Sequence, residues 1–360
     1  MSTASAATLD GLAKLALGIA LAGPGGGWQR ALRVVAQAEA LGLHSVWLPE
    51  GHFERGATPS PLLALCAFAA RTQRLRLATT SLLLPLHDPL RVAAEAATLD
   101  ALSGGRLLLG LGRGFRPRTF AAFQVSAAEK RDRFDAALDA ILAAWPAAAA
   151  QASGGADAGA ADGADGADGS ARDGGGERES AERGHPPLVV AAFGRKGLLQ
   201  AARRGLPYLA SPLESLDALA ENYGFWREHL APSAAAGGPG GGPPGGGAGA
   251  AANAAPRAPV MRTVFVAADD GEAARVLGAL EAEAAARARF VGGALARAAQ
   301  GGIEERAIVG SANFVRDGLA RYRERLGMDL AIARSEVPGA GESARDASLE
   351  RLATRVLPQL

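Results

Sequence analysis

Apolar and polar positions along residues 41–114 follow a fixed order of segments: the end of a helix, then strand, helix, strand, helix and strand. Strands that alternate with helices of this length predict parallel strands joined by helical crossovers. Each predicted strand ends in polar or glycine-rich residues, namely Glu50-Gly51-His52, Thr79-Thr80-Ser81 and Gly112-Arg113-Gly114. In (β/α)8 barrels the chemistry lies on that C-terminal rim of the strands. The segment therefore predicts both a fold and the place where functional residues gather.

The same alternation continues along the chain and predicts eight strands. We place them at 15–21, 44–50, 75–82, 106–112, 187–193, 206–211, 260–267 and 329–335. The predicted helices lie at 28–41, 59–71, 89–102, 119–145, 196–204, 215–230, 270–290, 312–326 and 345–356. The predicted fold class is therefore α/β, with residues 1–360 forming a single (β/α)8 TIM-barrel domain.

Two low-complexity stretches interrupt this pattern. Residues 147–184 are mainly alanine, glycine and aspartate, and residues 232–258 are mainly glycine, proline and alanine. Such segments bury too little to offset the entropy lost on ordering, so both are predicted to be disordered insertions. Each lies between a helix and the next strand, on the rim opposite the chemistry. The repeated Asp-Gly of the first lacks the ligand spacing of an EF-hand calcium loop.

Composition and charge narrow the class of protein. The 360 residues include 38 basic and 37 acidic ones, so no one-signed field attracts nucleic acid. The single cysteine, Cys66, cannot form an internal disulfide, which fits a reducing cytoplasm. No run reaches the roughly 18 apolar residues that span a membrane. Residues 15–23 run into glycines instead of a cleavage site, so we interpret them as the first strand and not a signal peptide. We expect a cytoplasmic protein with no nucleic-acid or membrane partner.

Three groups of residues on the predicted rim could carry chemistry. Glu50 and His52 flank Gly51, where a carboxylate and an imidazole can exchange a proton with a ligand or form a rim pair with neighbouring loops. Arg113 lies between two glycines, where a guanidinium can bind a phosphate or can pair with Glu50. Residues 193–197 open a helix with free N–H groups and two cations, which favours an anion, although such turns are common at helix starts.

Other chemistry-bearing residues are assigned structural roles. Trp47 is expected in the core. His87 and Asp88 follow the third predicted strand, and Pro89 and Arg91 are interpreted as helix-start and capping elements. The five histidines are scattered without metal-ligand spacing, so no metal site is predicted. The chain has no G-x-S-x-G elbow of a serine hydrolase and no G-x-G-x-x-G fingerprint for NAD after an early strand.

Four stretches of the chain carry a resemblance to a known family. They are SVWLPEGHF (45–53), LPLHDPLRVAAEAATLDALSGGRLLLGLGRGF (84–115), PLVVAAFGRKGLLQAARRGLPYLAS (187–211) and IVGSANFVRDGLARY (308–322). All four resemble the bacterial luciferase-like flavin monooxygenases, and they are spread along the chain before, between and after the two insertions. SGGRLLLGLGRGF after a D-x-L helix is a strong family marker.

The resemblance implies a barrel that binds reduced FMN, reacts it with oxygen and oxidises an organic substrate. By resemblance, Arg113 holds the flavin phosphate, and the turn Ala192-Phe193-Gly194-Arg195-Lys196 is the phosphate-binding turn. Thr80 and Ser211 would line the flavin. Glu50 and His52 match the acidic and second histidine positions of the E-H-H-F motif, with His52 moving a proton and Glu50 orienting it. The family also implies a homodimer, with the second and third helices as the interface.

Two residues depart from the family pattern. Gly51 stands where luciferase has the first histidine of the E-H-H-F motif, which argues against light emission. The turn at 192–196 lacks the small hydroxyl residues usual there, so phosphate binding would depend on backbone N–H groups and cationic side chains.

Three functions stay open from the sequence. The first is a flavin-dependent monooxygenase that receives reduced FMN from a separate reductase and acts on a small molecule. The second is an oxidoreductase of the same fold that transfers a hydride with a deazaflavin coenzyme. The third is a non-catalytic flavin-binding subunit, an interpretation that Gly51 supports. The substrate cannot be identified from the sequence.

Overall fold

The computed structural model describes residues 14–23, 27–154, 185–231, 257–288 and 301–360. Eight parallel strands form the barrel, at the positions that the hydrophobic pattern predicts. They are β1 (Ala16–Ala20), β2 (Ser45–Leu48), β3 (Arg76–Thr79), β5 (Leu107–Gly112), β6 (Leu188–Ala191), β7 (Tyr208–Leu209), β8 (Pro259–Val266) and β10 (Leu330–Arg334). Two short strands are added to these, β4 (Leu82–Leu83) beside β5 and β9 (Ala307–Gly310) beside β8.

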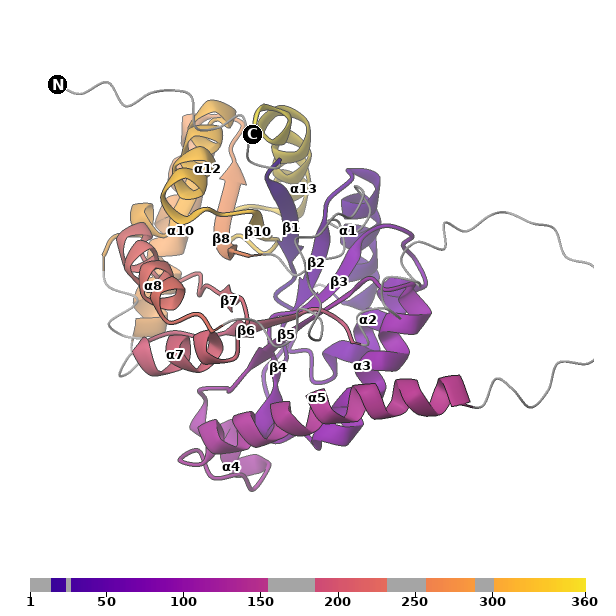
Figure 1. Ribbon diagram of the computed structural model, residues 1–360. Helices are drawn as coiled ribbons and strands as arrows, with labels where there is room; N and C mark the ends of the chain where they lie inside the picture. The colour runs from indigo at the N-terminus through magenta and orange to yellow at the C-terminus, as the bar shows by residue number, and fades with distance from the viewer. Residues whose placement is uncertain (1–13, 24–26, 155–184, 232–256, 289–300) are drawn as a thin grey trace, which may run out of the picture.

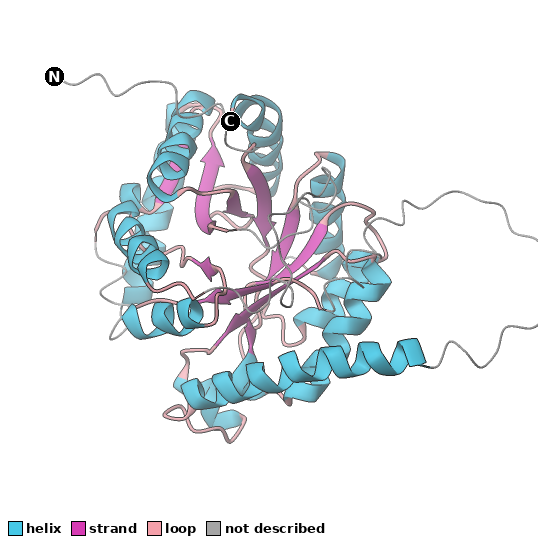
Figure 2. Cartoon of the chain, in the orientation of Figure 1, coloured by secondary structure: helices cyan, strands magenta, loops and turns pink. Residues whose placement is uncertain are grey.

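Parallel pairing runs in the order β7-β6-β5-β3-β2-β1-β10-β8-β9. A single parallel bridge between Ala210, which follows β7, and Val260 in β8 joins the two sides of this curled sheet. Helices surround the strands on the outside (Figures 1 and 2). They are α1 (Trp28–Ala40), α2 (Pro61–Ala69), α3 (Pro89–Ser103), α4 (Pro117–Ala122), α5 (Lys130–Gly154), α7 (Arg195–Arg203), α8 (Leu216–Glu228), α10 (Asp270–Ala288), α12 (Ala312–Leu326) and α13 (Glu342–Arg351). The predicted (β/α)8 barrel is confirmed.

Side chains from all eight strands fill the barrel interior, as the inward positions of parallel barrel strands must. This interior cluster comprises Ala20, Trp47, Ala78, Leu108, Val189, Leu209, Leu330 and Ile332, with Ala16, Ala191 and Met261 against it. Trp47 is fully buried there and its indole N–H donates to Ser45 Oγ at 2.8 Å. The prediction that Trp47 belongs to the core is confirmed. A larger cluster between strands and helices forms the second layer of the core.

Several element boundaries differ from the predicted ones. The single helix predicted at 119–145 is two helices, α4 and α5, separated by a turn. Helix α5 continues to Gly154, eight residues into the segment predicted as an insertion, because that stretch is rich in alanine, the strongest helix former. Residues 155–184 and 232–256, the bulk of both predicted insertions, lie outside the described residues.

The seam between β7 and β8 depends on one buried hydroxyl. Tyr223 in α8 places its Oη 3.1 Å from the Tyr208 carbonyl oxygen and 3.0 Å from the Pro259 carbonyl oxygen, within donating distance of either. These carbonyls belong to the two strands that meet at the 210–260 bridge. Tyr223 therefore links the two strands where backbone pairing is sparse.

Replacing Tyr223 with phenylalanine removes this donor and leaves buried carbonyls without it. We expect Tyr223→Phe to lower the free energy of unfolding by about 1–2 kcal/mol, measured by urea denaturation. Thr98→Val, which removes an exposed hydroxyl that donates to Ala94 O within α3, is the control and should change it by less than about 0.5 kcal/mol. Equal effects of the two substitutions would contradict the assigned role.

Candidate active site

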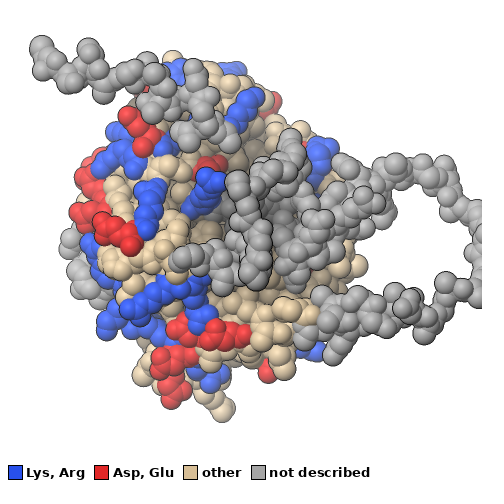
Figure 3. Space-filling view, viewed as in Figure 1, with Lys and Arg blue, Asp and Glu red and all other residues tan. Residues whose placement is uncertain are grey.

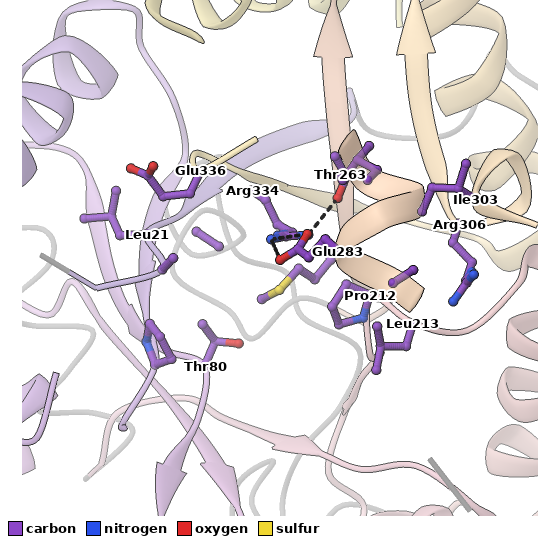
Figure 4. A pocket seen from close by; sticks show the side chains of 16 residues that line it. Leu21, Thr80, Pro212, Leu213, Thr263, Glu283, Ile303, Arg306, Arg334 and Glu336 are labelled. Atoms are coloured by element: carbon purple, nitrogen blue, oxygen red, sulfur yellow. Dashed lines mark hydrogen bonds and ion pairs between the residues drawn. The ribbon is translucent and has the colours of Figure 1, made fainter. Parts of the chain in front are cut away.

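A cavity of about 210 Å³ opens at the C-terminal mouth of the barrel (Figure 4). Its walls come from the ends of β1, β2, β3, β8 and β10, from the turn after β7 and from α10. Alternation along the strands explains which side chains reach it. In β10, Leu330 and Ile332 fill the interior, so Arg334 two residues further points into the mouth. In β2 the same alternation takes Trp47 into the interior and Pro49 to the cavity wall.

Thr80 is the predicted cofactor-binding residue that lines this cavity, at the end of β3. The peptide bond between Thr80 and Ser81 is cis. Gly112 faces this turn from β5, where an added Cβ would lie 2.0 Å from Ser81 Oγ. Glycine is therefore required at 112 for the two strand ends to lie side by side.

Arg113, which follows β5, lies against the first turn of α7. Its Nη1 donates to Gln200 Oε1 at 2.8 Å, and Gln200 Nε2 donates to Asp135 Oδ2 at 2.7 Å. An added Cβ at Gly197 would lie 2.3 Å from Arg113 Nη2, so the absence of a side chain at 197 makes room for the guanidinium. Arg113 pairs with Gln200 and not with Glu50, which corrects the alternative pairing considered from the sequence.

Cations gather around this guanidinium. Burial and, after it, the nearby charge of Arg131 lower the pKa of Arg113 to about 10, although Asp135 acts in the opposite direction. Burial and the charges of Arg113 and Arg131 likewise lower the pKa of Lys130. Figure 3 shows basic side chains gathered over α7, with acidic ones beside them. A ligand with negative charge would relieve the repulsion among these cations.

The predicted turn after β6 leads into α7. Ala192 is buried, and Gly194 is the N-cap residue, so the free N–H groups of the first helical turn follow directly. Arg195 stacks its guanidinium over the Phe225 ring at 4.4 Å, toward α8. Lys196 is exposed. The structure thus brings Arg113 together with the backbone of this turn, while the side chain of Arg195 is engaged elsewhere.

The turn after β7 is fixed from behind by a buried carboxylate. Glu214 accepts from Tyr208 Oη at 2.9 Å, from the Ser211 N–H at 3.1 Å and from Asn222 Nδ2 at 2.6 Å. Arg262 in β8 donates to the carbonyls of Ser211 and Glu214 at 2.8 and 2.7 Å. Ser211 itself is held by these contacts, while Pro212 and Leu213 line the cavity.

Sequence reasoning missed Glu214 and Arg262. A carboxylate three residues after a strand end is the kind of signal that could have indicated a fixed turn, but nothing local shows that its partners come from β7 and α8. Burial raises the pKa of Glu214, against the lowering effect of Tyr208, Arg262 and the other donors.

Glu50 and His52 lie together, as predicted, but with an additional partner. Glu50 Oε1 lies 2.6 Å from His52 Nε2, and Glu50 Oε2 lies 2.8 Å from His87 Nε2. The Leu83 N–H donates to the same carboxylate at 2.7 Å. His52 packs edge-on against Phe123, with ring centres 4.8 Å apart. These residues form a buried carboxylate–imidazole cluster.

Neither Glu50 nor His52 is among the residues that line the mouth cavity. Alternation in β2 explains this, because Leu48 faces the outer helix layer and Glu50 follows on the same side. An added Cβ at Gly51 would lie 3.3 Å from Ala57 Cβ, so this position is covered by the loop that follows. The contact of His87 with Glu50 was not predicted from the sequence. Pro89 does open α3, and Asp88 caps the helix by accepting from the Arg91 N–H at 2.9 Å.

Among the described residues, no group of three or more His, Cys, Asp or Glu side chains is placed to hold a metal ion. None of the described helices is both long enough and apolar enough to cross a membrane.

Residues 15–329 match the family model described as luciferase-like monooxygenase. The chain belongs to this family. The site residues named above lie within the matched residues, except Arg334 in β10.

Individual similarities agree with the family. The oxygenase component of a flavin-dependent trigonelline monooxygenase from Acinetobacter baylyi is 36% identical over 78 residues, 21% of this chain and 22% of that protein. A monooxygenase from Streptomyces bottropensis has a solved structure with a TM-score of 0.68 and 26% identity, covering 96% of this chain and 99% of that one. The oxygenating constituent of 3,6-diketocamphane monooxygenase from Pseudomonas putida, solved with FMN, has a TM-score of 0.69 and 19% identity, covering 96% and 98%.

These similarities have limits that matter for function. The sequence matches span about a third of the length of the first curated relatives. Identity of 19% shows the fold alone. Solved structures of F420-dependent enzymes share the same fold, so the fold does not select between a flavin and a deazaflavin.

The Glu50–His87 pair makes stability depend on pH. Burial would raise the pKa of Glu50, but the hydrogen bond and charge of His87, with the other donors, hold it below 4.5. Burial would lower the pKa of His87, but the hydrogen bond and charge of Glu50 hold it above 6.5. The Glu50 contribution is lost as pH falls through its lowered pKa, and the His87 contribution is lost as pH rises through its raised pKa.

We therefore expect His87→Gln, which keeps a neutral donor but no charge, to destabilise the protein most between about pH 4.5 and 6.5. The loss should be about 1 kcal/mol in this window and should shrink as pH rises further, in urea denaturation at a series of pH values. His229→Gln, at an exposed histidine that contacts the Phe225 carbonyl, is the control. A difference independent of pH would contradict the charged pair.

Proposed function

We propose that this protein is an FMN-dependent monooxygenase that uses reduced FMN and oxygen to oxidise a small organic substrate. One observation carries the proposal beyond the family: the guanidinium of Arg113, buried among cations, lies against the first turn of α7 at the mouth of the barrel. This combination of a guanidinium and a helix N-terminus is the arrangement that binds phosphate groups.

The residues at this place fit a flavin phosphate. A phosphate dianion would be held by Arg113 and by the N–H groups of the turn from Ala192 to Lys196. Its charge would counteract the burial and the repulsion from Arg131 that together lower the pKa of Arg113. The hydroxyl residues usual in the family are not needed, because backbone donors and guanidinium supply the hydrogen bonds. Lys196 adds an exposed cation at the entrance.

The flavin ring would occupy the mouth cavity, and the rest of the FMN molecule would extend across the rim to its phosphate at Arg113. Thr80 would contact it directly, and Ser211, fixed by Glu214 and Arg262, would contact the chain between ring and phosphate. When bound, the reduced flavin supplies the electrons and the site of oxygen activation. The apolar walls of the cavity, such as Leu21 and Leu213, would exclude water from it.

We propose Glu50 and His52 as the catalytic pair, with a separate role for each that its contacts support. Glu50 accepts from both imidazoles and so fixes the orientation of His52. His52 would then hold or move a proton at its other ring nitrogen. Because this cluster lies beside the cavity, its action on a ligand requires the ligand to extend over the loop that carries Gly51 to Ala57.

The proposal includes a separate flavin reductase and a cytoplasmic location. The relative named as an oxygenase component supports a two-component system by its name. Reduced FMN would then reach this protein by diffusion.

Binding of reduced FMN tests the proposed phosphate-binding site at Arg113 and the turn 192–196. We expect Arg113→Ala to weaken anaerobic binding of reduced FMN at least about tenfold, equivalent to about 1.4 kcal/mol, in a fluorescence-quenching titration. Reduced riboflavin, which lacks the phosphate, should bind the unaltered protein and Arg113→Ala with the same affinity. Arg118→Ala removes a cation from the same rim, where it stacks on Phe53, and should leave FMN binding unchanged.

A second variant moves the guanidinium without removing it. Gly197→Ala should weaken the binding of FMN, because its Cβ would displace Arg113 Nη2. Alanine stabilises a helix more than glycine does, so the expected effect comes from the displaced guanidinium. Gly224→Ala in α8, where an added Cβ meets nothing within 4 Å, is the matched control. If FMN and riboflavin bind alike in the unaltered protein, the phosphate assignment is wrong, and a deazaflavin coenzyme becomes the next ligand to titrate.

We also propose a homodimer that uses α2 and α3. Leu63 on α2 and Leu90 and Leu102 on α3 are exposed by 61–73%. The two helices pack against each other, so an interface formed by them could cover these side chains. The double substitution Leu63→Glu and Leu102→Glu should convert a dimer to a monomer in light scattering after size exclusion. The control is Leu230→Glu, at an exposed leucine that follows α8. A monomeric unaltered protein would contradict this interface.

A further inference from the structure

The mouth cavity has a hydrogen-bonded polar group on the side formed by β8, α10 and β10. Thr263, Glu283 and Arg334 form a hydrogen-bonded group contributed by β8, α10 and β10 (Figure 4). The part of the wall from β1 and β2 is apolar, formed by Ala20, Leu21, Ala22 and Pro49. A site of this kind receives a mainly apolar molecule and fixes its orientation through one polar group.

The charges on this wall do not balance. Glu336 lines the cavity, but its carboxylate is held by Arg30 at 2.5 Å and by Arg345, both of which lie outside the cavity wall. Arg306 also lines the cavity and donates to the carbonyls of Gly302 and Gly301 at 3.2 and 2.9 Å. In the part of the chain that the structure describes, Arg306 makes no ion pair. Among the described residues of this wall, the guanidinium groups of Arg306 and Arg334 therefore share one carboxylate that is not taken up by Arg30 and Arg345, that of Glu283, which has further contacts of its own.

The contact between Arg334 and Glu283 is long. The nitrogen–oxygen distances are 3.3 to 3.5 Å, whereas guanidinium–carboxylate hydrogen bonds are ordinarily about 2.7–2.9 Å. Arg334 Nη1 also lies 3.2 Å from Thr263 Oγ1. The side chain of Arg334 is 20% exposed, at the mouth, so an entering molecule can reach it. A planar oxyanion could make shorter bonds to Arg334 than Glu283 does.

We propose that Arg334, with Thr263, binds an oxyanion of the substrate, and that Glu283 gives up its contact with Arg334 when the substrate enters. The substrate class is a small, mainly apolar molecule with one carboxylate, phenolate or enolate group. This inference rests on the proposed function for its setting, since it assigns the substrate end of the same mouth. The guanidinium fork matches the two oxygens of a carboxylate, and the Thr263 hydroxyl can donate a further hydrogen bond.

Binding of a matched pair of probes tests this assignment without flavin. Fluorine NMR would compare para-fluorobenzoate with para-fluorobenzamide, which has nearly the same shape but no charge. We expect the flavin-free protein to bind the benzoate at least about tenfold more tightly than the amide. Arg334→Met should abolish this preference by weakening the benzoate alone. Arg334→Lys, which keeps the charge but loses the fork, should retain part of it.

Substitution of Glu283, the partner of Arg334, should change the affinity for benzoate in the opposite direction. Glu283→Gln removes the competing carboxylate and should tighten benzoate binding severalfold while leaving the amide unchanged. A purely structural Arg334–Glu283 pair predicts instead that both substitutions weaken both probes through loss of stability. Equal binding of the two probes to the unaltered protein, or an unchanged preference in Arg334→Met, would overturn the inference.

Failure here can be told apart from failure of the flavin assignment. Arg113→Ala should bind benzoate like the unaltered protein. Arg334→Met should keep the tighter binding of reduced FMN than of reduced riboflavin, because that difference comes from the phosphate at Arg113 and not from the cavity. If Arg334→Met weakens FMN and leaves the benzoate preference intact, Arg334 serves the cofactor and the inference is wrong. If benzoate binds as expected while Arg113→Ala binds FMN with unchanged affinity, the assignment of the phosphate to Arg113 is wrong and the assignment of the oxyanion to Arg334 is supported.

Discussion

The layer of side chains inside the barrel is the constraint on which the rest of the structure depends. All eight strands contribute to it, and Trp47 fills the largest share from β2. A packed interior leaves no passage along the axis, so a ligand can reach only the residues that follow the strands. The alternation that sends Trp47 and Ile332 inward also sets which residues face the mouth, such as Pro49 and Arg334. The same geometry turns Glu50 toward the outer layer.

Electrostatics at the rim separates two kinds of polar site. Around Glu50 and Glu214 each buried carboxylate has several donors, so these clusters are complete without a ligand and fix the loops that carry them. Around Arg113 the balance is reversed, because cations repel one another and the nearest acceptor is the neutral amide of Gln200. A bound anion would offset the cost of this arrangement.

The sequence was sufficient to predict the barrel because the period of apolar positions changes between strand and helix at every crossover. It also placed Arg113 and the turn at 192–196 on one rim, which the structure brings together. Contacts between segments that are distant in the sequence were harder to predict. Nothing near His87 indicates that Glu50 will reach it, and Glu214 acquires its role only when Tyr208 and Arg262 are brought beside it. The end of the helix at Gly154 was missed because alanine serves equally in a low-complexity run and in a helix.

A crystal structure of the protein with bound FMN tests the central claim most directly. The account predicts the phosphate oxygens within about 2.7–3.2 Å of the Arg113 guanidinium and of backbone N–H groups at the start of α7, with the ring in the mouth cavity beside Thr80. A phosphate bound elsewhere on the rim, for example at Arg306, with Arg113 still held only by Gln200, would contradict it.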